Sequence, residues 1–387
     1  MSSPAGTPRT LVPAQAWPCL AAALYVLLSV AFAYDREHGF TGLLRFGETF
    51  AATRLPEVAA ANPRTFEGNG YDGQFYAQLA VEPDPREPAA QTALDNPRYR
   101  ARRILLPTVV HVLGFGHVGL TLNLFALANV ACWLALGWLL WRRVAPLGWP
   151  GAGIWLGCML GMGALDSVRL SLTDLPAMLL ILLGVELAER GTRFGTLGAL
   201  AAATLTRETA LLAVGGSTTG DLRERPTRLR LAANAALVVL PLALWVWWLA
   251  GNVPAGTTVG NEAHFAAPFA GWLRHVATCL REIAAGNFDS RFTFGLLAAL
   301  SLAWQAAVVL RALSLNPPLW VRVGAPFALL VFLIGDPVWS GYWAAARTCL
   351  PLTFAFNLLL PRNRWFWPQL ALGNICVLHA VVRLWPG

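Results

Sequence analysis

The chain has 387 residues, of which 56% are apolar and only 13% are charged, and its mean hydropathy is +0.52. A soluble domain carries about 25% charged residues, so the composition excludes an ordinary soluble protein and predicts an all-α, polytopic membrane protein. The net charge of +8 comes from 29 arginines without any lysine, which excludes a Schiff-base lysine and a Walker-type phosphate loop. Much of this charge lies between apolar segments, where membrane topology explains it better than binding to nucleic acid.

Apolar segments follow one another along the chain and predict about 9 to 11 transmembrane helices. They form a single integral-membrane domain over residues 17–387, after a cytoplasmic tail at 1–16. The first segment also resembles a signal peptide, because Ala31-Phe32-Ala33 has the form of a cleavage site, but we favour a retained helix. The clear spans are 17–34, 119–141, 148–165, 175–189, 231–250, 292–310, 323–339, 347–361 and 365–384.

Arginine clusters set the orientation, because basic loops stay on the cytoplasmic side. All the clusters lie inside if 104–118 is an interfacial helix on the outer surface and 195–220 forms two half-helices that turn back. The prediction is then nine crossings and one re-entrant pair, with two outer loops at 35–118 and 251–291, the first of them partly helical. The alternative, that 104–118 or 195–220 crosses the membrane, stays open. The clusters are Arg142–Arg143, Arg190–Arg193, Arg223–Arg230, Arg311–Arg322 and Arg362–Arg364.

The first outer loop contains the strongest candidate for chemistry, the sequence Gly-Tyr-Asp-Gly-Gln-Phe-Tyr at 70–76. A carboxylate near the outer headgroup plane, such as Asp72, can take the proton of an attacking hydroxyl. Gln74 and Tyr76 could orient the acceptor or the base, and the glycines allow a tight turn. The alternative is a surface turn with a hydrogen-bonded aspartate. The candidates here are Tyr71, Asp72, Gln74 and Tyr76.

A basic cluster closes the same loop and leads into the predicted interfacial helix. Guanidinium groups bind phosphate oxygens in a bidentate way, and outside the membrane the positive-inside trend does not explain them. A phosphate or pyrophosphate headgroup explains them, and attachment to anionic membrane lipids is the alternative. The candidates are Asp95, Arg98, Tyr99, Arg100 and Arg103.

Four further ionisable residues lie within apolar segments or at their ends. Asp174 could face the same outer cavity as Asp72, or it could cap the helix that begins there. Arg207 and Glu208 lie within an apolar segment, where ionisable residues are costly and indicate function or a structural ion pair. Being adjacent, they need not pair with each other. Arg347 could contact a lipid phosphate or extend along apolar surface to the interface.

No spacing of cysteines or histidines predicts a metal site. The six cysteines form no Cys-x-x-Cys pair, and the six histidines show no His-x-His or His-x-x-x-His spacing. We therefore expect no cofactor, although a divalent metal is not excluded by these patterns.

Taken in order, several motifs resemble those of bacterial membrane glycosyltransferases of the GT-C superfamily, in particular the proteobacterial proteins named for cell-surface glycopolymer formation. The similarity covers about residues 17–360. The motifs are the 70–76 sequence, the Tyr-Arg-x-x-Arg-Ile-x-x-Pro element at 99–107, Thr173-Asp174, the Leu-Thr-Arg-Glu-Thr element at 205–209, and Ala-x-Arg-x-x-Leu-Pro-Leu at 345–352. The proline after Asp174 comes one residue later than in the family.

The resemblance implies a glycosyltransferase of the bacterial inner membrane that uses a polyprenyl-phosphate sugar. Asp72 would be the catalytic base of an inverting transfer to a cell-surface glycan or lipid acceptor. Arg100, Arg103 and Arg347 would stabilise the departing phosphate. Many members have two adjacent acids in this loop, whereas Gly73 follows Asp72, which puts metal use in doubt. The rival functions are a transporter or flippase for lipid-linked sugars, and a non-catalytic assembly subunit.

Overall fold

The computed structural model describes residues 13–255, 264–314 and 316–385. Helices dominate this part of the chain, and its only strands are β1 (Phe46–Gly47) and β2 (Thr65–Phe66), which pair in parallel. The predicted all-α class is therefore confirmed. Most of the expected tail at 1–16 lies outside the described residues.

Four helices among the described residues are long and apolar enough to cross a membrane. They are α1 (Trp17–Phe32), extended by the short helix η1 (Ala14–Ala16), α7 (Val118–Val144), α12 (Arg225–Asn252) and α14 (Ser290–Arg311). A fifth span results if α8 (Trp149–Met159) and α9 (Met162–Arg169) are taken together, because they meet at a bend of 48°.

The other expected spans are shorter or broken helices, so length and composition support fewer crossings than the 9 to 11 predicted. The segment 347–361 breaks at Cys349, where α17 ends and α18 begins; Pro351 lies in the first turn of α18, where its missing N–H is tolerated. Broken helices occur in membrane proteins where neighbouring helices bury the irregular backbone. The shorter helices that occupy the remaining expected spans are α10 (Asp174–Glu189), α15 (Leu319–Val331), α17 (Tyr342–Thr348), α18 (Leu350–Leu359), α19 (Phe366–Gly373) and α20 (Val377–Leu384).

The segment expected to turn back does so. It consists of α11 (Arg193–Thr206) and the 3₁₀ helix η6 (Glu208–Ser217), joined at Arg207. Asn234 of α12 lies at both ends of it: its Oδ1 is 3.3 Å from Nε of Arg193, and its Nδ2 donates to the carbonyl of Ser217 at 3.1 Å. The other uncertain segment forms α6 (Leu105–Leu113), whose nine residues are too few to cross a bilayer alone.

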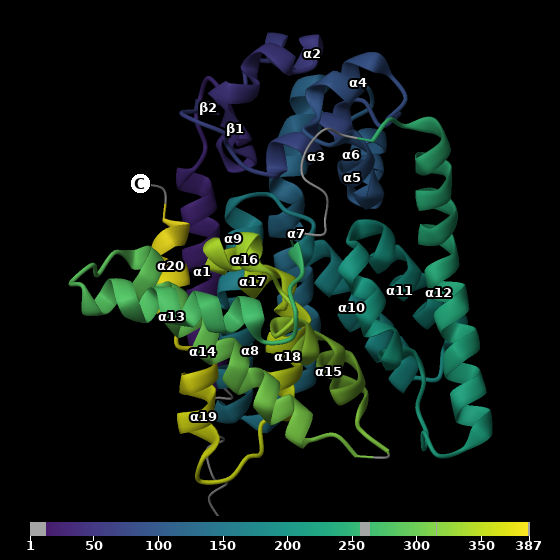
Figure 1. Cartoon of the computed structure of the whole chain (residues 1–387), viewed down its shortest axis with the longest axis vertical. Helices are drawn as coiled ribbons and strands as arrows, with labels where there is room; N and C mark the ends of the chain where they lie inside the picture. Colours follow the sequence, from purple (N-terminus) through teal and green to yellow (C-terminus); the bar gives the residue numbers. More distant parts are fainter. Residues whose placement is uncertain (1–12, 256–263, 315, 386–387) are drawn as a thin grey trace, which may run out of the picture.

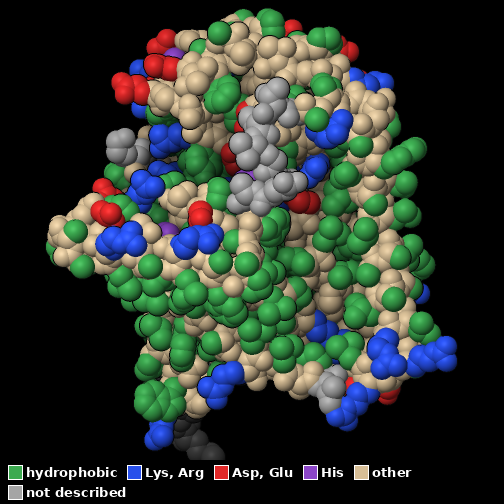
Figure 2. Space-filling view, in the orientation of Figure 1, with side chains coloured by type: hydrophobic (Ala, Val, Ile, Leu, Met, Phe, Trp, Pro, Cys, Tyr) green, Lys and Arg blue, Asp and Glu red, His purple; other side chains and the backbone are tan. Residues whose placement is uncertain are grey.

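Several of the arginine clusters meet at one end of the molecule. Arg143 at the end of α7 pairs with Glu189 at the end of α10. Arg322 at the start of α15 donates to the carbonyls of Thr218 and Gly220 beyond η6. Figure 2 shows basic side chains at the end that holds the start of α12, whereas acidic and basic side chains are mixed at the opposite end. This asymmetry is the one that the positive-inside rule requires.

The predicted first outer loop folds over the other end of the bundle as a partly helical cap (Figure 1). In the predicted second outer loop, residues 256–263 lie outside the described residues, and α13 (Ala270–Ala284) lies across the bundle. Farther along the chain, α16 (Asp336–Ser340) joins α15 to α17. The helices of the cap are η2 (Thr41–Leu44), η3 (Glu48–Thr53), α2 (Pro56–Ala60), α3 (Gly73–Val81), α4 (Pro88–Ala93), α5 (Pro97–Arg100) and η4 (Ala101–Arg103), with α6 beneath; η5 (Ala145–Leu147) joins α7 to α8.

Candidate functional site

A cavity of about 490 Å³ lies between the cap and the bundle. Its polar wall comes from the loop before α3, from η4 and from the junction of α11 and η6. Its apolar wall comes from the end of α15, from α16 and from the segment near residue 265. The lining residues are Tyr71, Asp72, Tyr99, Arg102, Arg103, Arg207, Glu208, Thr209, His264, Phe265, Leu330, Ile334, Pro337, Val338, Ala344, Arg347 and Thr348.

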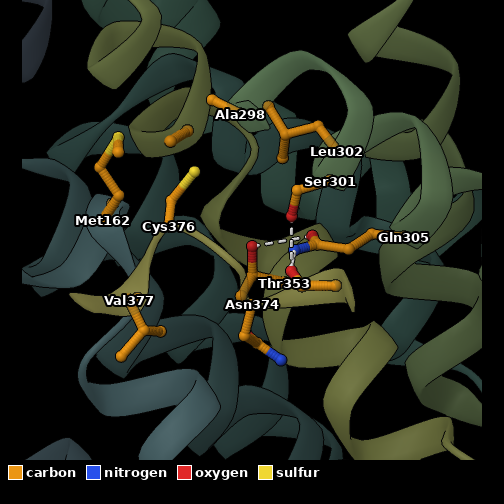
Figure 3. Close-up of a pocket in the computed structure, with 13 residues that line it drawn as sticks. Met162, Ala298, Ser301, Leu302, Gln305, Thr353, Asn374, Cys376 and Val377 are labelled. Atoms are coloured by element: carbon orange, nitrogen blue, oxygen red, sulfur yellow. Dashed lines mark hydrogen bonds between the residues drawn. The ribbon is translucent and has the colours of Figure 1, made fainter. Parts of the chain in front are cut away.

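A second cavity, of about 40 Å³, lies inside the bundle (Figure 3). Ser301 and Gln305 both donate to the carbonyl of Gly373 at 2.6 Å, and Thr353 donates to Gln305 at 2.9 Å. Its lining residues carry no charge and its polar groups satisfy one another, so it offers no acid, base or anion-binding group.

Two glycines place Asp72 at the mouth of the larger cavity. Gly70 has a positive φ of 63°, which L side chains rarely adopt. A Cβ on Gly73 would lie 2.4 Å from the carbonyl oxygen of Leu170, so only glycine lets α3 start against the turn between α9 and α10. Asp72 occupies the N-cap position of α3 without capping it. Its carboxylate instead meets Arg100, with Nη2 3.0 Å from Oδ1, and 32% of the side chain stays exposed.

The arginines around Asp72 keep it ionised. Burial alone would raise the pKa of its carboxyl, but Arg100, Arg347 and Arg103 together outweigh burial and hold the pKa well below its usual value. Its ion pair therefore stabilises the fold at and above the ordinary titration range of an aspartate, near pH 4. This stabilisation is lost only as the pH falls through the lower pKa of the folded state.

Arg100 and Arg103, three residues apart, are buried within the cap, and carboxylates occupy their guanidinium groups. Arg100 makes a bidentate contact with Asp95, at 2.7 Å for both bonds, and Arg103 makes one with Glu208 at 2.8 and 2.7 Å. Both donate to the hydroxyl of Tyr76. Arg103 also donates to the hydroxyl of Tyr99 at 2.7 Å. Burial would lower the pKa of each guanidinium, but the facing carboxylates raise both.

A second ion-pair group forms the inner end of the polar wall. Asp174 forms ion pairs with two arginines: its Oδ1 lies 2.9 Å from Nη1 of Arg207, and its Oδ2 lies 3.3 Å from Nη1 of Arg347. Arg347 also donates to the hydroxyl of Tyr71 at 2.9 Å, and Arg207 donates to Thr348 at 3.2 Å. As the sequence suggested, Arg207 and Glu208 do not pair with each other but with Asp174 and Arg103. Arg347 is buried, which rules out the alternative in which it extends to the membrane interface.

The structure brings most of the predicted residues together but gives several of them different positions from those expected. Asp174 neither caps α10, whose N-cap is Thr173, nor faces the cavity, because its side chain is only 1% exposed. Asp95, Arg100 and Tyr76 lie behind the cavity wall and hold Asp72 and Arg103, so we no longer expect them to touch substrate.

Gln74 and Arg98 belong to the scaffold of the cap. The buried amide of Gln74 accepts from the backbone N–H of Gly47 at 3.0 Å and donates to the carbonyl of Asn69 at 2.8 Å. Arg98 donates to the carbonyls of Val253 and Ala250, which fastens the cap to α12. In the described geometry both side chains bind backbone groups of the protein and do not line the cavity.

Sequence reasoning missed Arg102, which lines the cavity. Its Nε is buried without a hydrogen-bond partner, and no ion pair joins it to any described residue. Arg347 likewise has a buried Nε without a partner. The sequence shows Arg102 among its neighbours, but each residue of a short helical turn is rotated by about 100–120° from the last. Arg102 and Arg103 both line the cavity, and a shift of one position decides which of them pairs with Glu208.

Within the described residues, no group of three or more histidine, cysteine, aspartate or glutamate side chains is arranged to hold a metal ion. No family model, curated protein or solved structure matches the chain. The geometry of the site is therefore the basis for any functional assignment.

Proposed function

We propose that the chain is a GT-C-type glycosyltransferase of a bacterial inner membrane. It moves a sugar, with inversion, from a polyprenyl phosphate to a cell-surface glycan or lipid acceptor at the outer face. The observation that carries the proposal is the ionised, partly exposed Asp72 at the edge of the cavity under the cap. The proposal includes the topology of nine crossings and one re-entrant pair, in which broken helices complete the spans. Transfer of labelled sugar by the purified protein tests it.

The proposed reaction needs one base and one group that stabilises an anion. The acceptor oxygen forms a bond to the anomeric carbon, and its proton passes to Asp72. The bond between that carbon and the phosphate oxygen breaks, and the phosphate leaves with the electron pair. Preorganised cations at this oxygen lower the barrier. Arg102 and Arg347 suit the role, because they line the cavity and each has a donor without a partner. Arg100 and Arg103 are committed to carboxylates.

An apolar groove beside the cavity supports a lipid-linked donor. It has a volume of about 420 Å³ and is formed by Ile104, Leu205, Pro241, Leu244, Trp245 and Trp248. Ile104 follows the cavity residue Arg103, and Leu205 comes just before Arg207, so groove and cavity adjoin along two segments. A prenyl chain in the groove would place its phosphate beside the arginines. We assign the groove to the prenyl chain of the donor.

Replacing Leu244 with Trp is expected to fill part of the groove. The KM for a donor with a long prenyl chain should then rise several-fold, because the chain loses apolar contact area. The KM for a donor with a short chain should change little. Steady-state kinetics with both donors measure this. Val239→Trp is the matched control, since Val239 is exposed on the same helix about 140° around its axis. Equal effects of the two substitutions would contradict the assignment.

Replacing Arg102 with Gln is expected to weaken donor binding about 10- to 100-fold, which corresponds to the loss of one charge-assisted hydrogen bond. Because no described residue would lose a partner with Arg102, stability should stay unchanged, and so should the KM for the acceptor. Donor titrations and thermal unfolding measure the two effects. In Arg98→Gln the pattern should reverse, with lower stability and normal donor affinity. An unchanged donor affinity in Arg102→Gln would remove the phosphate assignment.

A further inference from the structure

A second arginine cluster, formed by Arg45, Arg169 and Arg383, lies outside the cavity. Asp166, buried in α9, is 3.5 Å from Nε of Arg169 at the end of that helix and 3.5 Å from Nη1 of Arg383 in the last turn of α20. Neither contact is a hydrogen bond, since the two nitrogens and Oδ2 of Asp166 are buried without partners. Arg45, in the cap, makes no ion pair with any described residue.

The charge of this cluster differs from that of the cavity wall. Around the cavity, Arg100, Arg103, Arg207 and Arg347 face four carboxylates, those of Asp72, Asp95, Asp174 and Glu208, and Arg102 adds one charge without an ion pair to a described residue. In the second cluster, the half-buried Arg169 and Arg383 share one aspartate, and the half-buried Arg45 makes no ion pair with a described residue. Burial lowers the pKa of Arg45, and repulsion from Arg169, the exposed Arg64 and Arg383 lowers it further. Like charges held together out of water are costly unless an anion compensates them.

The backbone and the aromatic neighbours hold this cluster in place. Arg45 has a φ of +56°, an uncommon conformation for a residue other than glycine and one that marks strain. The guanidinium of Arg383 lies over the ring of Trp343 at 4.8 Å. Trp343 donates to the hydroxyl of Tyr71 at 2.8 Å, and the backbone N–H of Tyr71 donates to the carbonyl of Arg45 at 2.9 Å. Tyr71 and Trp343 therefore link this cluster to the cavity.

We propose that the cluster of Arg45, Arg169 and Arg383 is a second anion-binding site, which takes a phosphate group. Guanidinium groups match phosphate oxygens in charge and geometry, and the phosphate supplies the negative charge that the cluster lacks. Exposed aromatic side chains nearby, including Phe32 and Trp385 with ring centroids 5.2 Å apart, are typical of the headgroup level of a membrane. The site does not depend on the proposed glycosyl transfer.

The experiment measures thermal unfolding of the purified full-length protein in a neutral detergent. One series adds phosphatidylglycerol, and another adds inorganic phosphate at constant ionic strength. We expect the midpoint to rise saturably in at least one series, because a ligand of the folded state stabilises it. Stabilisation by lipid alone identifies a headgroup site, and stabilisation by inorganic phosphate identifies a site for a soluble phosphate. Apparent affinity should fall at least about 10-fold in Arg45→Gln and in Arg383→Gln.

Two controls separate this site from others. Arg274→Gln, which removes an exposed arginine paired with Asp336, should leave the ligand effect intact. Arg102→Gln should also leave it intact, even if the proposed transferase activity is never found. Without ligand, Arg45→Gln should unfold at the same temperature as the wild type or above it, because a repelled cation is removed. The proposal is overturned if neither ligand stabilises the protein, if Arg45→Gln and Arg383→Gln keep the effect, or if Arg102→Gln abolishes it.

Discussion

Asp72→Asn should lower sugar transfer by about 10²- to 10⁴-fold, the usual contribution of a general base. The amide keeps the shape of the side chain but takes no proton at neutral pH. The fold should survive, because Arg100 keeps its two bonds to Asp95. The measurements are transfer from a labelled polyprenyl-phosphate donor, together with the amount and unfolding temperature of the purified variant.

Asp95→Asn is the matched control for this prediction. This substitution also removes a carboxylate that pairs with Arg100, but Asp95 does not line the cavity. We expect it to lower stability and to leave transfer within a few-fold of the wild type. If both variants lose transfer equally, the loss comes from the uncompensated charge of Arg100 and not from the removal of a catalytic base. Wild-type transfer by Asp72→Asn would exclude the proposed base and favour a flippase, a transporter or an assembly subunit.

The types of residue at the site were predictable from the sequence, but the directions in which their side chains point were not. An ionisable side chain in an apolar chain must find a partner, so the predicted acids and arginines became partners of one another. Which arginine faces the cavity depends on the rotation of a four-residue helix that runs into a 3₁₀ turn. This rotation follows from packing against Tyr76 and Glu208, which lie far apart in the chain.

Some features of the overall architecture were likewise predictable from the sequence, and others were not. Hydropathy and the distribution of arginines predicted the helical class, the cap and the segment that turns back at Arg207. They did not predict where helices break, as at Cys349 and between α19 and α20. Local breaks depend on which neighbouring helices bury the freed backbone groups, and a hydropathy pattern carries no information about those neighbours.

Arg103→Gln should destabilise the fold by about 3–5 kcal/mol, the usual cost of removing one partner of a buried ion pair. The side chain of Arg103 is 5% exposed, and it joins η4 to η6 through Glu208, whose side chain is 25% exposed. The substitution leaves the carboxylate of Glu208 without its partner and the hydroxyl of Tyr99 without its donor, and the hydroxyl of Tyr76 keeps only the longer bond from Arg100. Denaturant or thermal unfolding measures the loss, with Arg274→Gln as the control, since an exposed pair contributes about 0–1 kcal/mol.

The double variant Arg103→Gln with Glu208→Gln decides whether the pair is structural. If the cost comes from an uncompensated carboxylate, removing that carboxylate should recover part of the stability, and the two substitutions should not add. Additive losses would mean that each side chain is held by other contacts. If the double variant regains stability and also transfers sugar, Arg103 acts only by joining the cap to the re-entrant segment. If it regains stability without transfer, Arg103 or Glu208 acts on the substrate, since both line the cavity, and the purely supporting role of this pair would be wrong.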